Sequence, residues 1–343
     1  MITMISSLKQ PRILVFDIIK LFAIFLVVWG HCIMHLQGYK YDCWENPLYR
    51  WIYSFHMPLF MMVSGFFSAR ADGSFIKFTA KKFRQLILPS LVFGVIFALS
   101  WHFVTGGGIS KAFVTCYWFL KSAFICALLY FVAMRFSSKS VGYVVTLAAS
   151  IFLSIYMVNM MYPAFIIGTI ISRYREQFSR CAFWTSLATG VAFVIMFAVQ
   201  DADMAADSYL KIFSYFHSGG FNEFLQQFCR FSFKVVLGLM GSIFCIALFI
   251  ELAKYMHASR VGRTLGQWGT LTLGIYLWQA ILLEHLMMKT INLSSFTLPL
   301  FNYVISPLIS LIVLLVCILL TKELKSNPWT AFLMLGAPRP VSK

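Results

Sequence analysis

The first long apolar run is ILVFDIIKLFAIFLVVWGHCIMHL, which covers residues 13–36. As a helix it can cross the hydrocarbon core of a bilayer, which takes about 20 apolar residues. The run also holds Lys20 and His31, with ten residues between them. At about 100° per residue their side chains fall within roughly 20° of each other on a helix, about 16 Å apart along its axis. Ionisable groups inside a membrane helix are costly, so this pair is a functional hypothesis.

The composition of the whole chain indicates an integral membrane protein. Its 343 residues are 60% hydrophobic and 12% charged, whereas soluble domains carry about 25% charged residues. The net charge of +16 would suit a nucleic-acid-binding protein, but the basic residues lie in short segments between apolar runs. The cysteines have no metal-ligand spacing. We therefore expect one membrane domain over residues 1–343, with the lipid bilayer as a partner and no nucleic acid.

Further apolar runs predict an all-α bundle of about ten transmembrane helices. The fifth and sixth runs are separated only near Val158, so they form either a tight hairpin or one broken span. Most Lys and Arg fall on one side of the predicted bundle, and the positive-inside rule places that side and both termini in the cytoplasm. The segment 208–233 mixes aromatic and polar residues and could lie at the outer interface. The runs lie near 13–36, 51–69, 86–104, 117–134, 141–157, 159–172, 182–200, 231–253, 268–288 and 302–321.

Lys20 has three possible roles. Its long side chain could reach the membrane interface, or it could form a structural ion pair with Asp17, three residues before it. The third possibility is an ammonium that faces a substrate, with Asp17 lining the same site. We expect this third role, because ionisable residues inside membrane spans generally mark substrate paths.

Two histidines are expected at similar depth in the membrane. His31 lies near the outer third of the first run, and His56 lies near the outer end of the second run, which is antiparallel to it. Imidazole is the usual general base near neutral pH. His31 could instead be a structural histidine, or a metal ligand together with His35 four residues later. The neighbouring runs supply no third ligand, so we expect no metal site.

The second run, SFHMPLFMMVSGFFSAR at residues 54–70, continues toward the cytoplasm. Pro58 permits a kink. Ser64 lies about 12 Å deeper than His56, near the level of Lys20. The Ser64-Gly65 pair could serve either the site or close helix packing.

These two runs resemble the acyltransferase 3 family of ten-helix membrane acyltransferases. FDIIKLFAIFLVVWGH at 16–31 and FHMPLFMMVSGFF at 55–67 are similar to its first two helices, and Lys20 and His31 match its motif of a basic residue, ten spacers and a histidine. Looser similarities follow in RQLILP at 84–89, YWFL at 117–120 and LGIYLWQ at 273–279. Many members have a histidine where Gln279 stands, so that position is given no role. Glu284 and His285 are the alternatives, and the sequence leaves them open.

The resemblance implies acyl transfer from a cytoplasmic acyl-CoA, most often acetyl-CoA, to a hydroxyl of a cell-surface carbohydrate or related acceptor. The expected location is a cell membrane, the bacterial inner membrane in particular. The estimated 16 Å between Lys20 and His31 is of the order of the pantetheine arm. Lys20 could hold a phosphate or amide oxygen, and His31 could act as general base or become acylated itself. His56 would orient the acceptor or polarise the thioester.

Other residues are expected to bind the donor or line the path. Basic inner segments would attract the anionic head of acyl-CoA, although the positive-inside rule alone explains most of these charges. Trp118 and Glu284 are expected to line the substrate path with Asp17, although an interfacial role is the alternative for the tryptophan. The residues expected to bind the donor beside Lys20 are Ser64, Arg70, Lys81, Lys82 and Arg84.

The main rival function is a transporter or flippase for a glycan or a lipid-linked intermediate. Buried Lys, His and Glu residues suit a substrate path across a membrane. The two halves of the chain show no matching broken helices, which disfavours this alternative. A structural subunit of a polysaccharide-synthesis complex is a second rival, and it predicts no turnover.

Overall fold

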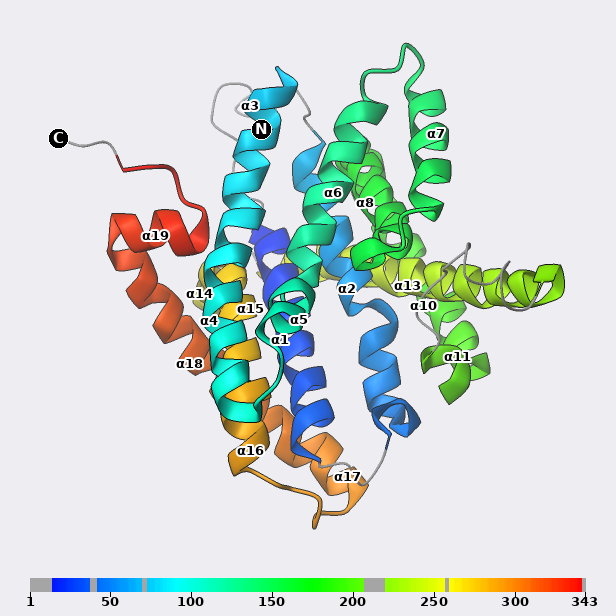
Figure 1. The fold of residues 1–343 in the computed structure, drawn as a ribbon. Coiled ribbons are helices and arrows are strands. Elements are labelled where there is room, and N and C mark those ends of the chain that lie inside the picture. Colours follow the sequence, from blue (N-terminus) through cyan, green and yellow to red (C-terminus); the bar gives the residue numbers. More distant parts are fainter. Residues whose placement is uncertain (1–13, 38–41, 70–72, 207–219, 257–258, 341–343) are drawn as a thin grey trace.

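The computed structural model describes residues 14–37, 42–69, 73–206, 220–256 and 259–340. Within these ranges every regular element is helical, so the predicted all-α class is confirmed (Figure 1). The first part of the chain forms α1 (Leu14–Leu36), η1 (Cys43–Glu45), α2 (Pro47–Ser68), α3 (Phe75–Lys82), η2 (Phe83–Ile87), α4 (Leu88–Thr105), α5 (Ile109–Thr115), α6 (Trp118–Ala133), α7 (Lys139–Ile151), η3 (Ile155–Met157) and α8 (Val158–Arg173). The second part forms α9 (Arg175–Arg180), α10 (Ala182–Val199), α11 (Ala202–Ala206), α13 (Gly220–Met256), α14 (Arg260–Gly269), α15 (Thr272–Ile281), η4 (Leu282–Met287), α16 (Met288–Thr290), α17 (Leu298–Leu300), η5 (Phe301–Ile305), α18 (Ser306–Ser326) and α19 (Pro328–Leu335).

The helices support fewer membrane crossings than the ten that the apolar runs predict. Among the described residues, six helices are long and apolar enough to span, or eight if each of two bent pairs is one span. The two other expected spans are α2 and α7. Helix α2 carries polar residues such as Arg50 and His56, and α7 has 13 residues, which is about 20 Å. The structure therefore supports a multi-pass membrane bundle with six to eight such spans.

Loops expected on opposite sides of the membrane lie at opposite ends of the bundle. In Figure 1, α3 and the connection from α6 to α7 lie at the top, whereas α16 and α17 lie at the bottom. The loop after α16 meets the end of α1, because the Leu293 N–H donates to the Leu36 carbonyl at 2.9 Å. Asn46, which caps α2, exchanges two side-chain hydrogen bonds with Asn302 at this end. These contacts hold the ends of α1 and α2 in place.

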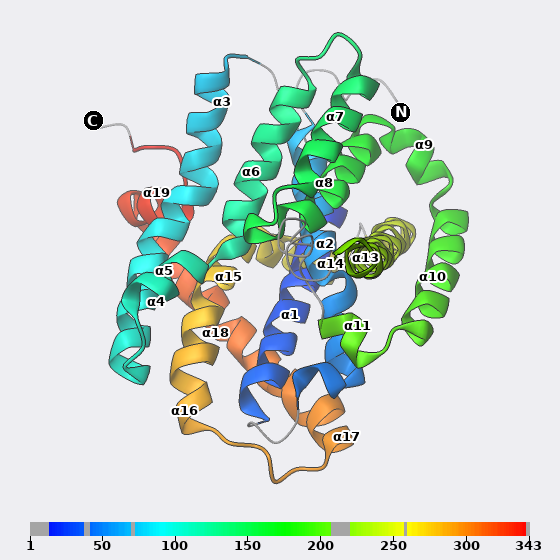
Figure 2. The same ribbon diagram turned by 45° about the vertical axis from the view of Figure 1, so that its right-hand side comes forward.

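Helix α13 begins earlier than expected and is 37 residues long. It crosses the bundle and projects beyond it in Figure 1, and Figure 2 views it nearly end-on. The expected interfacial segment therefore continues as part of this helix from Gly220, while residues 208–219 lie outside the described residues.

Glycines allow α2 and α8 to pack backbone against backbone. A Cβ atom at Gly65 would lie 2.0 Å from the Phe165 carbonyl oxygen, and one at Gly168 would lie 1.9 Å from the Met62 carbonyl oxygen. Small residues at such crossings let membrane helices approach closely. Gly65 thus serves helix packing, and its neighbour Ser64 faces a cavity instead.

We expect Gly65→Ala to destabilise the fold by about 2 kcal/mol or more, because the added methyl group must push the two backbones apart. Thermal unfolding of the detergent-solubilised protein would show a lower midpoint. Gly108→Ala is the matched control, since a Cβ atom there meets nothing within 4 Å. Equal midpoints for the two variants would contradict this account of the packing.

Candidate functional site

Three adjoining cavities among the described residues lie along α2, and α1 lines two of them. The lysine cavity, of about 250 Å³, contains Lys20 in its wall. The histidine cavity, of about 320 Å³, contains His31 and shares Val27, Met57 and Tyr276 with the lysine cavity. The third, which we call the arginine cavity, has about 350 Å³ and shares Tyr53, His56, Met57 and Trp118 with the histidine cavity. Met57 thus lines all three cavities, and the histidine cavity shares further wall residues with each of the other two.

The lysine cavity brings two predicted cations together. Lys20 of α1, Ser64 of α2 and Lys82 at the end of α3 line it, and much of the remaining wall is apolar. The Lys20 ammonium lies 2.6 Å from the Asp17 carboxylate, and Lys82 donates to the Ser68 hydroxyl at 2.7 Å. Asp17 is buried and reaches this cavity only through its ion pair with Lys20. A narrow, mostly apolar cavity with two ammonium groups suits a thin chain with an anionic end.

The other predicted donor-binding cations are not placed in the cavity wall. Lys81 is exposed and Arg84 is half-buried, and neither lines the lysine cavity. Because consecutive residues on a helix differ by about 100°, Lys82 can face the cavity while Lys81 faces away. Arg70 lies outside the described residues.

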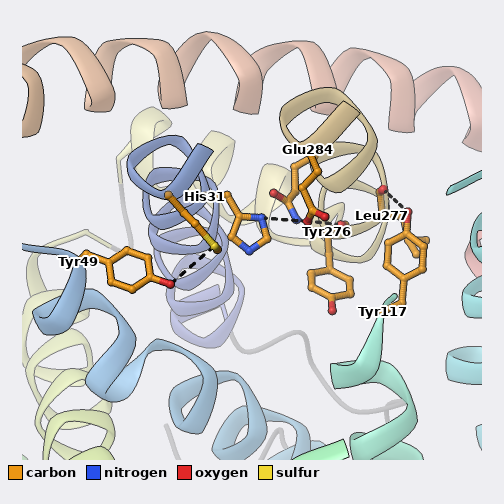
Figure 3. Close-up of polar contacts among 8 residues, drawn as sticks. His31, Tyr49, Tyr117, Tyr276, Leu277 and Glu284 are labelled. Carbon is orange, nitrogen blue, oxygen red and sulfur yellow. Dashed lines mark hydrogen bonds and ion pairs between the residues drawn. The ribbon is translucent and has the colours of Figure 1, made fainter. Parts of the chain in front are cut away.

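The histidine cavity brings together His31, His56, Trp118 and Glu284. The Nδ1 atom of His31 lies 3.7 Å from the Glu284 carboxylate, and Figure 3 shows the two side chains pointing toward each other. This distance is that of an ion pair and exceeds a hydrogen bond. The two side chains keep 19% and 24% of their surface exposed. The cavity therefore leaves both groups open to a small molecule.

The tautomer of His56 follows from one contact. Its Nδ1 atom lies 2.7 Å from the Ile52 carbonyl oxygen, which can only accept a hydrogen bond. Nδ1 therefore carries the proton, and in the neutral ring Nε2 is left as an acceptor. The ring is buried, and it lies in the wall between the histidine and arginine cavities.

A π-helical turn decides which residue of the Glu284-His285 pair faces His31. Gln279 and Glu284 are five residues apart, which would place them about 140° apart on an α-helix. The turn over Leu282–Met287 is wider, with i to i+5 hydrogen bonding, and both side chains line the histidine cavity. His285 instead turns toward α4, where it contacts the Ser100 hydroxyl and lies against the ring of Phe97. Of the two residues that the sequence left open, Glu284 is therefore the one that lies beside His31.

The same turn supplies a third potential metal ligand. Ligand atoms of His31, His35 and Glu284 all lie within 4.8 Å of one another. We expected no metal site because no third ligand lies near His31 and His35 in the sequence. That reason is wrong, because Glu284 reaches the two histidines from a distant segment. The three groups could bind a divalent cation, or the carboxylate could orient the imidazole of His31.

Several residues that line the site were given no role from the sequence. Tyr53, Tyr276 and Gln279 line the histidine cavity, and the hydroxyl of Tyr117 donates to the Leu277 carbonyl at 2.9 Å. Tyr117 has a φ of 50°, which is unusual for a residue with a side chain, and it lies at the 48° bend between α5 and α6. The YWFL and LGIYLWQ segments contain Tyr117, Tyr276 and Gln279 and could have signalled them. Tyr53 has no comparable signal.

The sequence matches one family model over most of its length and two curated proteins over about half of it. The model of the acyltransferase 3 family, described as an acyltransferase domain, matches residues 13–322. Nodulation protein NolL of Mesorhizobium japonicum is 32% identical over 180 residues, which cover 47% of this chain and 48% of that protein. NolL of Sinorhizobium fredii is 32% identical over 191 residues, which cover 50% of this chain and 52% of that protein. The chain thus spans about half the length of the curated relatives it matches. No solved structure matches it.

A cysteine at position 64 should report the charge of the lysine cavity. In Ser64→Cys, with the exposed Cys181 and Cys229 changed to serine, we expect a sulfonate-bearing thiol reagent to react about tenfold faster than a trimethylammonium reagent. The reason is the two ammonium groups in the same wall. Ser122→Cys, at a fully buried position on α6, should stay unlabelled. Equal rates for the two reagents at position 64 would contradict the placement of Lys20 and Lys82.

Proposed function

The chain belongs to the acyltransferase 3 family, and from this premise we propose that it transfers an acyl group from acyl-CoA to a hydroxyl of a carbohydrate or related acceptor at the cell surface. The observation that carries the proposal is the pair of adjoining cavities with Lys20 in the wall of one and His31 in the wall of the next. These are the two residues of the motif that the first helix shares with the family. Acetyl is the proposed acyl group.

The donor would thread from the lysine cavity to the histidine cavity. Its phosphates would lie at the Lys20 and Lys82 end, since ammonium groups bind phosphate oxygens. Its thin arm would pass the walls that both cavities share, which Val27, Met57 and Tyr276 form. The rise of a helix puts His31 about 16 Å beyond Lys20, so the thioester would arrive beside the imidazole.

His31 is proposed as the general base. Glu284 would hold the Nδ1–H of the imidazole, and Nε2 would take the proton of the acceptor hydroxyl. Catalytic hydrogen bonds are often long before substrate binds, which fits the 3.7 Å separation. The hydroxyl oxygen attacks the thioester carbonyl, the carbon–sulfur bond breaks, and the imidazolium returns the proton to the departing thiolate. This direct transfer needs the lone pair of His31, so we propose that no metal ion takes part and that no acyl-histidine forms.

His56 is proposed to orient the acceptor. Because its Nδ1–H is held by the Ile52 carbonyl, its Nε2 can accept a hydrogen bond from an acceptor hydroxyl but cannot donate one to the thioester oxygen. Trp118 lies in the same shared wall and would line the path of the acceptor.

The proposed setting is the bacterial inner membrane, with the chain as a single membrane domain that crosses it ten times. Helix α2 would count as a crossing, because it runs antiparallel to α1 and leads to α3 at the opposite end of the bundle (Figure 1). Both termini and the lysine cavity would then lie toward the cytoplasm, where acyl-CoA is made. Basic residues on that side follow the positive-inside rule.

A transporter or flippase remains the second candidate, and the three adjoining cavities favour it. A transporter would move its substrate unchanged, whereas the acyltransferase releases one CoA thiol for each acyl group transferred. Release of CoA by the purified protein therefore separates the two functions.

We expect His31→Ala to lower acyl transfer by about 10²–10⁴-fold, because the general base is lost. The measurement is incorporation of labelled acetyl from acetyl-CoA into surface glycan, with the amount of protein in the membrane checked in parallel. His102→Ala is the control, since that ring is exposed and contacts the Gly107 carbonyl. Undiminished incorporation by His31→Ala would overturn the enzyme assignment.

A second pair of variants tests the role of the π-helical turn. We expect Glu284→Gln to reduce kcat by about 10–100-fold, because the imidazole loses the carboxylate that orients it. His285→Gln can keep a hydrogen bond to Ser100, and kcat should stay within about twofold of wild type. Steady-state CoA release measures both. If His285→Gln were the more damaging change, His285 would take the place of the family histidine.

A further inference from the structure

The arginine cavity adjoins the histidine cavity along the wall that contains His56 and Trp118, and Lys20 does not line it. Its volume of about 350 Å³ can hold a small ring compound. Its wall combines three aromatic rings with two cations, Arg50 and Lys234. The proposed donor path meets this cavity only at Met57.

Two buried polar atoms in this wall have no hydrogen-bond partner among the described residues. They are the Nε of Arg50, which is a donor, and the Oε1 of Gln200, which is an acceptor. Arg50 makes one bond within the cavity, from Nη1 to the Gln200 carbonyl at 3.4 Å. Buried polar groups are normally paired, so an unmatched donor and acceptor on two residues that line one cavity favour a polar ligand there. Hydroxyl groups both donate and accept, so a polyol can satisfy both atoms.

The aromatic side chains suit a ring rather than an open chain. Trp44, Tyr53 and Trp118 line the cavity, and the rings of Trp44 and Tyr53 meet edge to face at 5.9 Å. Flat apolar faces beside a few placed polar groups are typical of sites for small polar rings. These rings therefore favour a saccharide as the occupant.

The charge of the wall favours an anion. No carboxylate lines the cavity among the described residues. The guanidinium of Arg50 presents a planar set of donors that matches a carboxylate or phosphate. Lys234 adds a second cation, with its Nζ donating to the Ala205 carbonyl at 2.6 Å and lying 5.7 Å from the ring of Trp44.

We propose that the arginine cavity is the acceptor subsite and that it takes a saccharide carrying an anionic group. Arg50 binds the anion, the unpaired Gln200 oxygen binds a sugar hydroxyl, and a further hydroxyl reaches His56 and His31 across the shared wall. The proposal rests on the proposed function, because it names the class of acceptor that receives the acyl group.

The test compares two sugars that differ in one group. The affinities of 4-nitrophenyl glucuronide and 4-nitrophenyl glucoside are measured on the full-length protein in detergent, with glucose 6-phosphate against glucose as the arm for phosphate. We expect at least one anionic sugar to bind about tenfold or more tighter than its neutral partner. In Arg50→Gln this difference should vanish while the neutral sugars keep their Kd. Arg135→Gln is the matched control, because it removes the same charge at an exposed residue outside this cavity.

Several results would overturn the proposal. They are equal affinities of anionic and neutral partners in the wild type, no binding of any of the four sugars, or an equal loss for both partners in Arg50→Gln. Acetyl-CoA binding is measured in parallel on the same variants. If acetyl-CoA does not bind the wild type, the proposed function is contradicted whatever the sugars show. If acetyl-CoA binds and the sugar comparison fails, only the inference about the acceptor subsite is contradicted.

Discussion

Ionisable groups inside a bilayer must face protein or water, and this constraint orders the structure around α1. Lys20 and His31 lie on one face of that helix, and each meets a carboxylate, Asp17 at 2.6 Å and Glu284 at 3.7 Å. The first partner comes from the same helix and the second from a segment some 250 residues later in the chain. Charges that would be costly in lipid are thus gathered onto internal cavities.

Close backbone packing keeps those cavities between the same helices. Gly65 and Gly168 bring α2 and α8 together, and a Cβ atom at Gly269 would lie 1.8 Å from the Asp17 carbonyl oxygen of α1. Small residues at helix crossings fix the distance between backbones. The glycine at position 269 therefore positions the helix turn that carries the Asp17–Lys20 pair, and Gly65 positions the turn that carries Ser64.

The sequence predicted the helical class and placed Ser64 near the level of Lys20, because apolar runs and helical periodicity are local properties. The sequence did not predict which basic side chains of one segment line the cavity. Lys81 and Arg84 were grouped with Lys82 by charge alone, yet neither of them lines the lysine cavity. The count of crossings also differs, since α2 is too polar and α7 too short to resemble ordinary spans.

Residue spacing alone places an ammonium and an imidazole on one face of the first helix, because eleven residues are close to three whole turns. That Glu284 rather than His285 meets this imidazole is a result of the three-dimensional packing. A π-helical turn shifts the side-chain register within its own helix, and the spacing of apolar residues in the sequence does not predict where it occurs. The arginine cavity is likewise tertiary, because Trp44, Trp118 and Gln200 come from separate helices and loops. Contacts between distant segments depend on how helices pack, which the pattern along one helix does not contain.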